Sequence, residues 1–157
     1  MLSLVTLLVV SAPHAVVCQL DGANWNALVD AAVVSTTAVT GRRLGLSLAS
    51  DAAGGNPKLD VSVDWSSLEG KTAATVSAQN AKLGDALQAF WLPGDAKKFY
   101  LEKGTVTVEG LDIAGKSVTL VLDLVLREGN ALRAAKNSGN PSHTVKCTLT
   151  RVPLVVQ

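Results

Sequence analysis

The sequence predicts an α+β domain, in which a mainly antiparallel sheet carries two amphipathic helices packed on it. Two kinds of periodicity lead to this prediction. Several short segments alternate apolar and polar residues, as strands with one buried face do. Two other segments repeat apolar residues at the spacing of a single helix face. The length of 157 residues fits one domain with room for a hydrophobic core.

Alternating apolar positions predict five strands, over 44–48, 59–65, 74–78, 118–126 and 145–149. In the fourth, every second residue is Val or Leu, and the residues between them are mixed. Pro153 predicts that the last strand ends there or lies at a sheet edge, because proline cannot donate a ladder hydrogen bond. The segment 99–108 predicts a hairpin with its turn at 102–104.

The two helices are expected over 23–38, where Asp21 can act as the cap, and from Asn80 to the Pro93-Gly94 stop. Their apolar stripes consist of Trp25, Leu28, Val29, Ala32 and Val33 in the first helix and of Leu83, Ala86, Leu87, Phe90 and Trp91 in the second. The segment 50–57 predicts a loop, and a helical turn is expected at 131–136 in the polar connection before the last strand.

The N-terminal segment 1–15 differs in composition from the remainder. Its apolar run over 2–10 is typical of a signal peptide and too short to span a bilayer, so we expect no integral membrane span. No Lys or Arg precedes the run, and Pro13 lies three residues before a cut after Ala15. The alternative is therefore an apolar first strand, followed in either case by a single domain over 16–157.

The leader favours a periplasmic or otherwise exported protein of the cell envelope, and a virion or cytoplasmic protein is the alternative. The two cysteines, Cys18 and Cys147, lie near opposite ends of the chain. In an exported protein a disulfide between them would close a very long loop and add about 3–5 kcal/mol of stability. In a cytoplasmic protein they would be two buried thiols.

Composition argues against several classes of partner. The formal net charge is +1 and charged residues make up 17% of the chain, so no strong field attracts nucleic acid. Aromatic residues make up 4%, too few to predict a stacking platform for single strands. We therefore expect a protein partner or self-association, and no nucleic acid.

One motif matches the phosphate-binding P-loop pattern: Gly110, Gly115, Lys116 and Ser117 occupy its fixed positions. A P-loop must open into a helix whose amides hold the phosphates. Here Ser117 is followed by the alternating residues of a strand, and Asp112 places a negative charge inside the loop. We therefore interpret the match as accidental and the segment as a β-hairpin turn, with no bound cofactor.

No catalytic or metal-binding constellation emerges. His143 and Cys147 would share a strand face about 13 Å apart, beyond hydrogen-bonding reach. Asp60 and Asp64 are expected on a solvated strand face. The basic residues expected near the C-terminal hairpin predict only a hydrated surface: Arg127, Arg133, Lys136, Lys146 and Arg151. We expect no catalytic residue, no metal ligand and no enzymatic activity.

The segment 58–110 follows a recognisable order of strand, strand, helix and hairpin. The residues that carry this order are Val61, Val63, Asp64, Trp65 and Leu68 in the first part, Asn80, Leu83, Ala86 and Leu87 in the helix, and Gly104, Val106 and Val108 in the hairpin. The pattern resembles the short N-terminal (STN) domain of secretins and TonB-dependent receptors. The resemblance covers about a third of the chain and implies a β-β-α-β-β part that contacts other proteins and carries no active site.

The function expected from these observations is a non-catalytic, envelope or periplasmic protein-interaction module that binds through a sheet edge or a groove beside a helix. The alternative is a self-assembling structural subunit, such as a virion decoration or tail-type protein. A remote alternative, nucleotide binding, depends entirely on the match at 110–117.

Overall fold

The computed structural model describes residues 14–82, 84–129 and 139–157. The described residues form β1 (His14–Leu20), β2 (Ala23–Thr37), β3 (Gly41–Ser50), β4 (Lys58–Asp64), β5 (Ala74–Gln79), β6 (Leu87–Leu92), β7 (Phe99–Asp112), β8 (Ser117–Glu128) and β9 (Ser142–Val156). A single 3₁₀ turn, η1 (Trp65–Ser67), follows β4.

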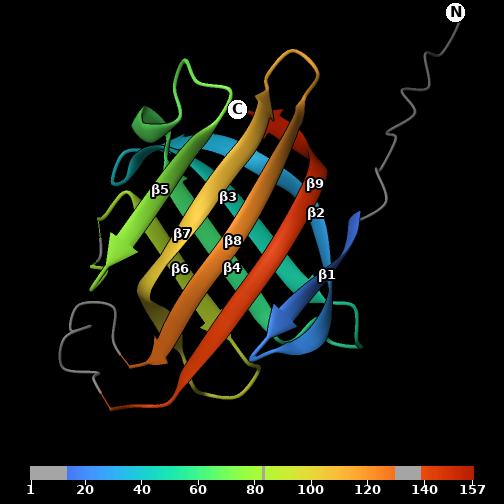
Figure 1. Cartoon of the computed structure of the whole chain (residues 1–157), viewed down its shortest axis with the longest axis vertical. Coiled ribbons are helices and arrows are strands. Elements are labelled where there is room, and N and C mark those ends of the chain that lie inside the picture. Colours follow the sequence, from blue (N-terminus) through green and yellow to red (C-terminus); the bar gives the residue numbers. More distant parts are fainter. Residues whose placement is uncertain (1–13, 83, 130–138) are drawn as a thin grey trace, which may run out of the picture.

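Eight of these strands close into a barrel in the order β7, β6, β4, β3, β2, β1, β9, β8, with β8 pairing back to β7 (Figure 1). The pairs are antiparallel except for one short contact, where the end of β2 runs parallel to the end of β9. Strand β5 lies outside the ring, and β7 is its only partner among the described strands. The barrel is therefore closed, with one additional strand attached to its wall.

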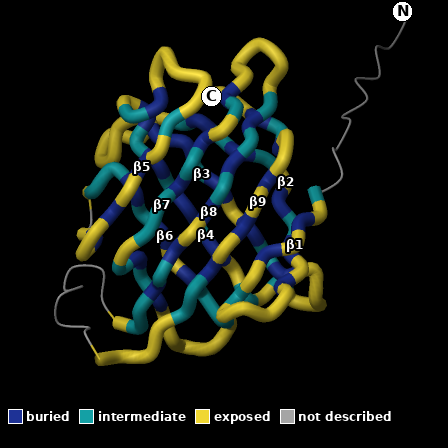
Figure 2. The backbone as a smooth tube through the Cα atoms, viewed as in Figure 1, coloured by how far each residue is buried: buried dark blue, intermediate teal, exposed yellow. Residues whose placement is uncertain are grey.

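The barrel interior is filled by side chains, as expected for a ring of this size. On β8 the inward residues are the alternating apolar positions of 118–126, and each of them is at most 2% exposed. The buried residues of β9 are Val145, Cys147, Leu149, Val152 and Leu154. Figure 2 shows buried positions along the strands and exposed positions at the turns. The strand predictions for these two segments are confirmed.

The α+β prediction is wrong, because the described chain holds an antiparallel barrel and no α-helix. The segment 23–38 contains β2, in which Trp25, Ala27 and Val29 alternate inward. A bulge between Val29 and Ala32 then shifts the alternation by one residue. Because of this shift, the inward residues Trp25, Val29 and Ala32 have the spacing of one helix face. This spacing explains why the segment was predicted to be a helix.

The second predicted helix is also wrong. Asn80 has a left-handed φ of 49° and lies in a turn, and Leu87, Ala89 and Trp91 alternate inward on β6. Phe90, expected on the buried stripe, points outward instead. Leu83 and the helical turn expected at 131–136 lie outside the described residues. The β-β-α-β-β order expected over 58–110 therefore lacks its helix.

The hairpin expected over 99–108 is one continuous strand, β7. Its turn-like residues form a bulge between Leu101 and Lys103 opposite β8. Pro153 does not end the last strand, because β9 continues to Val156. In the described part of the chain, no helix has the length and apolar character needed to cross a membrane.

Candidate functional site

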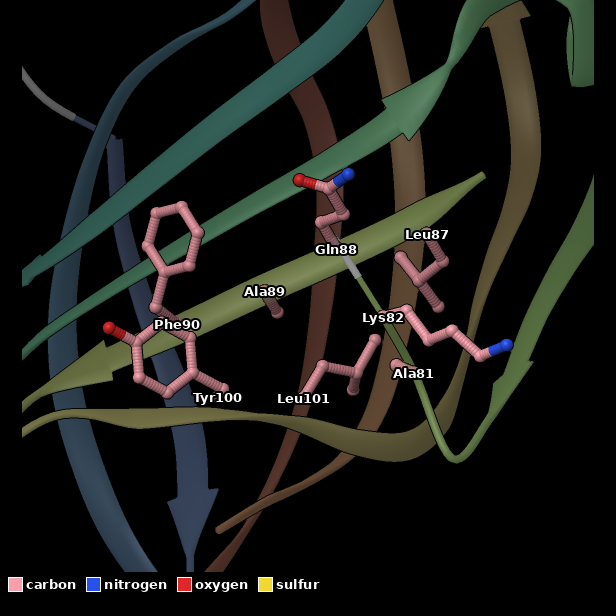
Figure 3. Close-up of a pocket in the computed structure, with 8 residues that line it drawn as sticks. All are labelled: Ala81, Lys82, Leu87, Gln88, Ala89, Phe90, Tyr100 and Leu101. Atoms are coloured by element: carbon pink, nitrogen blue, oxygen red, sulfur yellow. The ribbon is translucent and has the colours of Figure 1, made fainter. Parts of the chain in front are cut away.

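The barrel wall has a seam between β6 and β7. These two strands pair only at Phe90↔Tyr100 and Trp91↔Phe99. Beyond that point β7 pairs with β5, over Lys103 to Val108, so the edge of β6 that carries Leu87 to Ala89 separates from it. Ala81 and Lys82, from the connection between β5 and β6, lie at this opening (Figure 3).

A small hollow lies at the narrow end of the seam, with a volume of about 30 Å³. This space suits one methyl group or one water molecule, far less than a metabolite requires. Its apolar lining comes from Ala81, Leu87, Ala89 and Leu101, and its polar and aromatic lining from Lys82, Gln88, Phe90 and Tyr100. Figure 3 shows the two aromatic side chains together at one end of the hollow and Lys82 toward the other.

The distribution of aromatic side chains singles out this hollow. The chain has six aromatic residues. Four of them are buried: Trp25, Trp65, Trp91 and Phe99. The other two are Phe90 and Tyr100, register partners on the outer face, with ring centroids 6.2 Å apart in an edge-to-face arrangement. Phe90 is 36% exposed. The two aromatic side chains left outside the core therefore form one apolar contact point.

Charged groups lie next to this pair. In the register across the outer face, Asp60 is opposite Phe90, and Arg127 is opposite Tyr100. Arg127 forms a salt bridge with Glu102, and that hydrogen bond raises the pKa of the Arg127 guanidinium. The Arg127 Nη1 atom also donates to the Asn140 carbonyl at 2.6 Å. The aromatic pair therefore lies between an acidic group and a fixed guanidinium.

The connection between β5 and β6 is held by hydrogen bonds to β7 at Ala81 and to Arg43 of β3 at Asp85 and Ala86. The Ala81 amide donates to the Glu102 carbonyl of β7 at 3.0 Å. On the other side, one guanidinium nitrogen of Arg43 donates to the Asp85 and Ala86 carbonyls, each at 3.2 Å. Arg43 thus ties the start of β6 to the outer face of β3, so it positions one wall of the hollow.

Arg43 is buried, with 9% of its surface exposed. It also donates to the hydroxyl and carbonyl oxygens of Ser62. Burial lowers the pKa of the guanidinium, and the negative charge of Asp64 opposes that shift. Nothing in the sequence marked Arg43 as a buried residue, since it occupies an outward position of its strand.

A second polar group lies beside the aromatic core, where β1 turns into β2. His143 Nδ1 lies 2.6 Å from an Asp21 carboxylate oxygen, and the Thr144 amide donates to the other oxygen at 2.8 Å. Burial by itself would raise the pKa of Asp21, but these hydrogen bonds and the attraction to His143 lower it below the ordinary value. The His143 ring lies 4.6 Å from Phe99. This pair joins the β1–β2 turn to β9 and has a packing role.

The P-loop match lies in the turn between β7 and β8. Gly110 is still in β7, and Ser117 is the first residue of β8, so a strand follows the loop. The Asp112 carboxylate accepts the Gly115 amide at 2.7 Å, which closes the turn on itself. The amide that a phosphate would need is thus bound by the loop's own carboxylate.

The remaining predicted residues lie apart from the seam hollow. Cys18 and Cys147 are directly opposite each other on β1 and β9, with Cα atoms 4.4 Å apart, and they form a buried disulfide. Lys146 pairs with Asp123 at 3.1 Å. Arg133 and Lys136 lie outside the described residues. Within the described ranges, no three His, Cys, Asp or Glu side chains are grouped so as to hold a metal ion.

No protein-family model, curated protein or solved structure matches the chain. The protein is a closed, filled β-barrel with an additional strand, β5, and a hollow lined by two aromatic residues between β6 and β7.

Proposed function

We propose that this protein is a non-catalytic protein-interaction module of the cell envelope, and that a partner protein binds at the seam hollow. The observation that carries the proposal is the outward pair Phe90 and Tyr100 beside the hollow. Aromatic residues and arginine are enriched at the energetic centres of protein interfaces, around small desolvated pockets. Here the aromatic pair, the hollow and Arg127 supply those elements on one face.

The filled interior supports a surface role for the protein. Inward side chains of all eight ring strands belong to one buried core, as in small barrels whose interior is filled by side chains. Larger hollows lie on the outer face of β2, β3 and β4, but their lining residues include no aromatic side chain. The seam hollow is the better candidate for the site of partner binding because its lining contains both apolar and aromatic side chains.

The envelope location is supported by the buried disulfide, since disulfides persist in oxidising compartments. Fractionation of the source cells, together with N-terminal sequencing of the native protein, tests the location. We expect an envelope fraction whose chain begins after Ala15, and a cytoplasmic chain that begins at Met1 would contradict it.

The binding surface is tested by photo-cross-linking in the source cells. Phe90 is replaced by a photoreactive phenylalanine analogue, which retains an aromatic ring beside Tyr100. The matched control carries the analogue at Val121, an outward position of β8 that is paired on both sides. We expect one discrete cross-linked product at position 90, identifiable by mass spectrometry, and none at position 121.

A second variant shows whether the aromatic pair itself provides the affinity. Tyr100→Ala in the chain labelled at position 90 should lower the cross-linking yield at least fivefold while the melting temperature changes little. Equal, diffuse labelling at positions 90 and 121 would refute the proposed surface. A product whose mass is twice that of the chain would indicate self-association in place of a distinct partner.

A further inference from the structure

Strand β5 presents an open edge. It has six residues and is hydrogen-bonded along one side to β7, from Ala74↔Val108 to Gln79↔Lys103. In the described sheet it has no strand partner on its other side. Figure 1 shows β5 at the margin of the layer that it forms with β7, β8 and β9. An edge of this kind leaves alternate amide and carbonyl groups free to pair with another extended chain.

This edge lacks the features that usually prevent such pairing. Natural edge strands are blocked by Lys, by Pro, by bulges or by inward-pointing charges. Strand β5 has no charged residue and no proline, and its register with β7 is regular throughout. Its outward side chains are Thr75, Ser77 and Gln79. A strand laid beside it would meet no electrostatic or steric barrier from these side chains.

We propose that the open edge of β5 pairs with β5 of a second copy of this chain, in an antiparallel arrangement about a two-fold axis at Ser77. Opposed residues of an antiparallel pair lie on the same face, so a two-fold axis must place one residue opposite itself. With Ser77 at the axis, Thr75 of each copy faces Gln79 of the other, and Val76 faces Ala78.

The sequence of β5 suits this self-pairing. The outward row brings a hydroxyl opposite an amide at both ends and two hydroxyls together at the axis, so every outward side chain meets a hydrogen-bonding group. The inward row brings apolar residues together, which continues both barrel cores across the contact. Since the strand is uncharged, self-pairing brings no like charges together. A second copy is thus a chemically matched occupant.

The pairing is tested first by engineered disulfides. Both native cysteines are already bonded to each other and buried, so an added cysteine is the one free thiol in the protein. Directly opposed residues have Cβ atoms about 4.5–5.5 Å apart, within reach of a disulfide after small adjustment. Under mild oxidation, Ser77→Cys should give a covalent dimer as the main product. Thr148→Cys, at an exposed position of β9 that is paired with Val121 of β8, should stay mostly monomeric.

A mixing experiment tests the register. Thr75→Cys and Gln79→Cys chains should each cross-link poorly alone, whereas their equimolar mixture should form heterodimers at least fivefold more efficiently. A second, independent measurement uses light scattering after size-exclusion chromatography. The wild-type mass should rise toward twice the chain mass with concentration, and Ser77→Lys should remain monomeric because two ammonium groups would meet at the axis. Thr148→Lys serves as the matched control.

A wild-type protein that remains monomeric up to millimolar concentration, together with equal cross-linking at positions 77 and 148, would overturn the inference. This inference does not depend on the partner proposed for the seam hollow. A monomer that still cross-links to a different protein at position 90 would remove the β5 contact and leave the interaction-module proposal intact. A β5 dimer without the cross-link at position 90 would support the β5 contact and contradict the partner-binding role of the seam hollow.

Discussion

At the scale of single residues, Arg43 shows how a charged side chain is accommodated in a barrel wall. Its strand position points outward, yet the segment before β6 covers it, and 9% of the residue is exposed. Its guanidinium meets four oxygen atoms, belonging to Ser62, Asp85 and Ala86. Burial of a charge is tolerated when hydrogen bonds replace its hydration, and here the same bonds fix the segment that closes the seam.

Replacement of Arg43 should therefore destabilise the protein and loosen the seam. We expect Arg43→Met to lower the free energy of unfolding by about 2–4 kcal/mol, because it removes the charge-assisted hydrogen bonds that Arg43 donates to four partly buried oxygen atoms. Urea unfolding measures the loss. Arg42→Met is the control: Arg42 is exposed over the ring of Trp65, 4.9 Å from its centroid, and should contribute about 1 kcal/mol or less. Equal losses in the two variants would contradict the role of Arg43.

At the scale of strands, bulges account for two of the mispredicted segments, whereas the mispredicted strand β6 alternates regularly. The segments 118–126 and 145–149 keep an uninterrupted alternation of period two, so their faces were predictable residue by residue. Strand β2 loses this alternation at its bulge between Val29 and Ala32, and β7 loses it between Leu101 and Lys103. Both segments were assigned to other structures, one to a helix and the other to a hairpin.

The candidate site was less predictable than the strands. The sequence placed Phe90 on a buried helix stripe and gave no sign that it is opposite Tyr100, because strand register depends on pairing partners far apart along the chain. The hollow exists because β6 and β7 separate, which no local pattern encodes. The sequence signal that could have pointed to Phe90 and Tyr100 is the scarcity of aromatic residues in the chain.

Gly104 provides a test at this scale. It lies in β7 with φ of 152°, and a Cβ atom there would lie 2.4 Å from the Asp123 carbonyl oxygen and 2.9 Å from the Leu124 Cα of β8. Gly104→Ala should lower the free energy of unfolding by about 2–4 kcal/mol, since two backbones must separate. Thermal and urea unfolding measure it.

The matched control is Gly110→Ala in the same strand. A Cβ atom at Gly110 would meet Thr119 Cβ at 4.0 Å, an ordinary contact, and should change stability by less than about 1 kcal/mol. A loss at Gly104 as small as that at Gly110 would mean that β7 and β8 lie farther apart than the structure places them.

At the scale of the whole molecule, the disulfide joins two strands separated by almost the whole length of the chain. Cys18 and Cys147 are 129 residues apart and lie in the core contact between β1 and β9. Strand β1 meets β9 over only three register pairs, Cys18 to Leu20, so the covalent link reinforces a short contact.

The double variant Cys18→Ala/Cys147→Ala should lose about 3–5 kcal/mol of stability, mainly because its unfolded chain gains conformational freedom. Urea unfolding under oxidising conditions measures the loss. A reductant should destabilise the wild type and leave the double variant unchanged. If the wild type and the double variant unfold at the same urea concentration without reductant, the bridge contributes nothing.

The position of β9 in the ring also determines when the protein can fold. Strand β9 is synthesised after the other eight described strands, and it pairs with β8 as well as with the much earlier strands β1 and β2. While β9 is still in the ribosomal exit tunnel, the barrel lacks one of its strands and cannot close. The ring can close only after β9 has left the exit tunnel, and contacts over such sequence distances form slowly. Until β9 emerges, the nascent chain therefore exposes the edges of β8 and β1 that β9 pairs with in the folded protein.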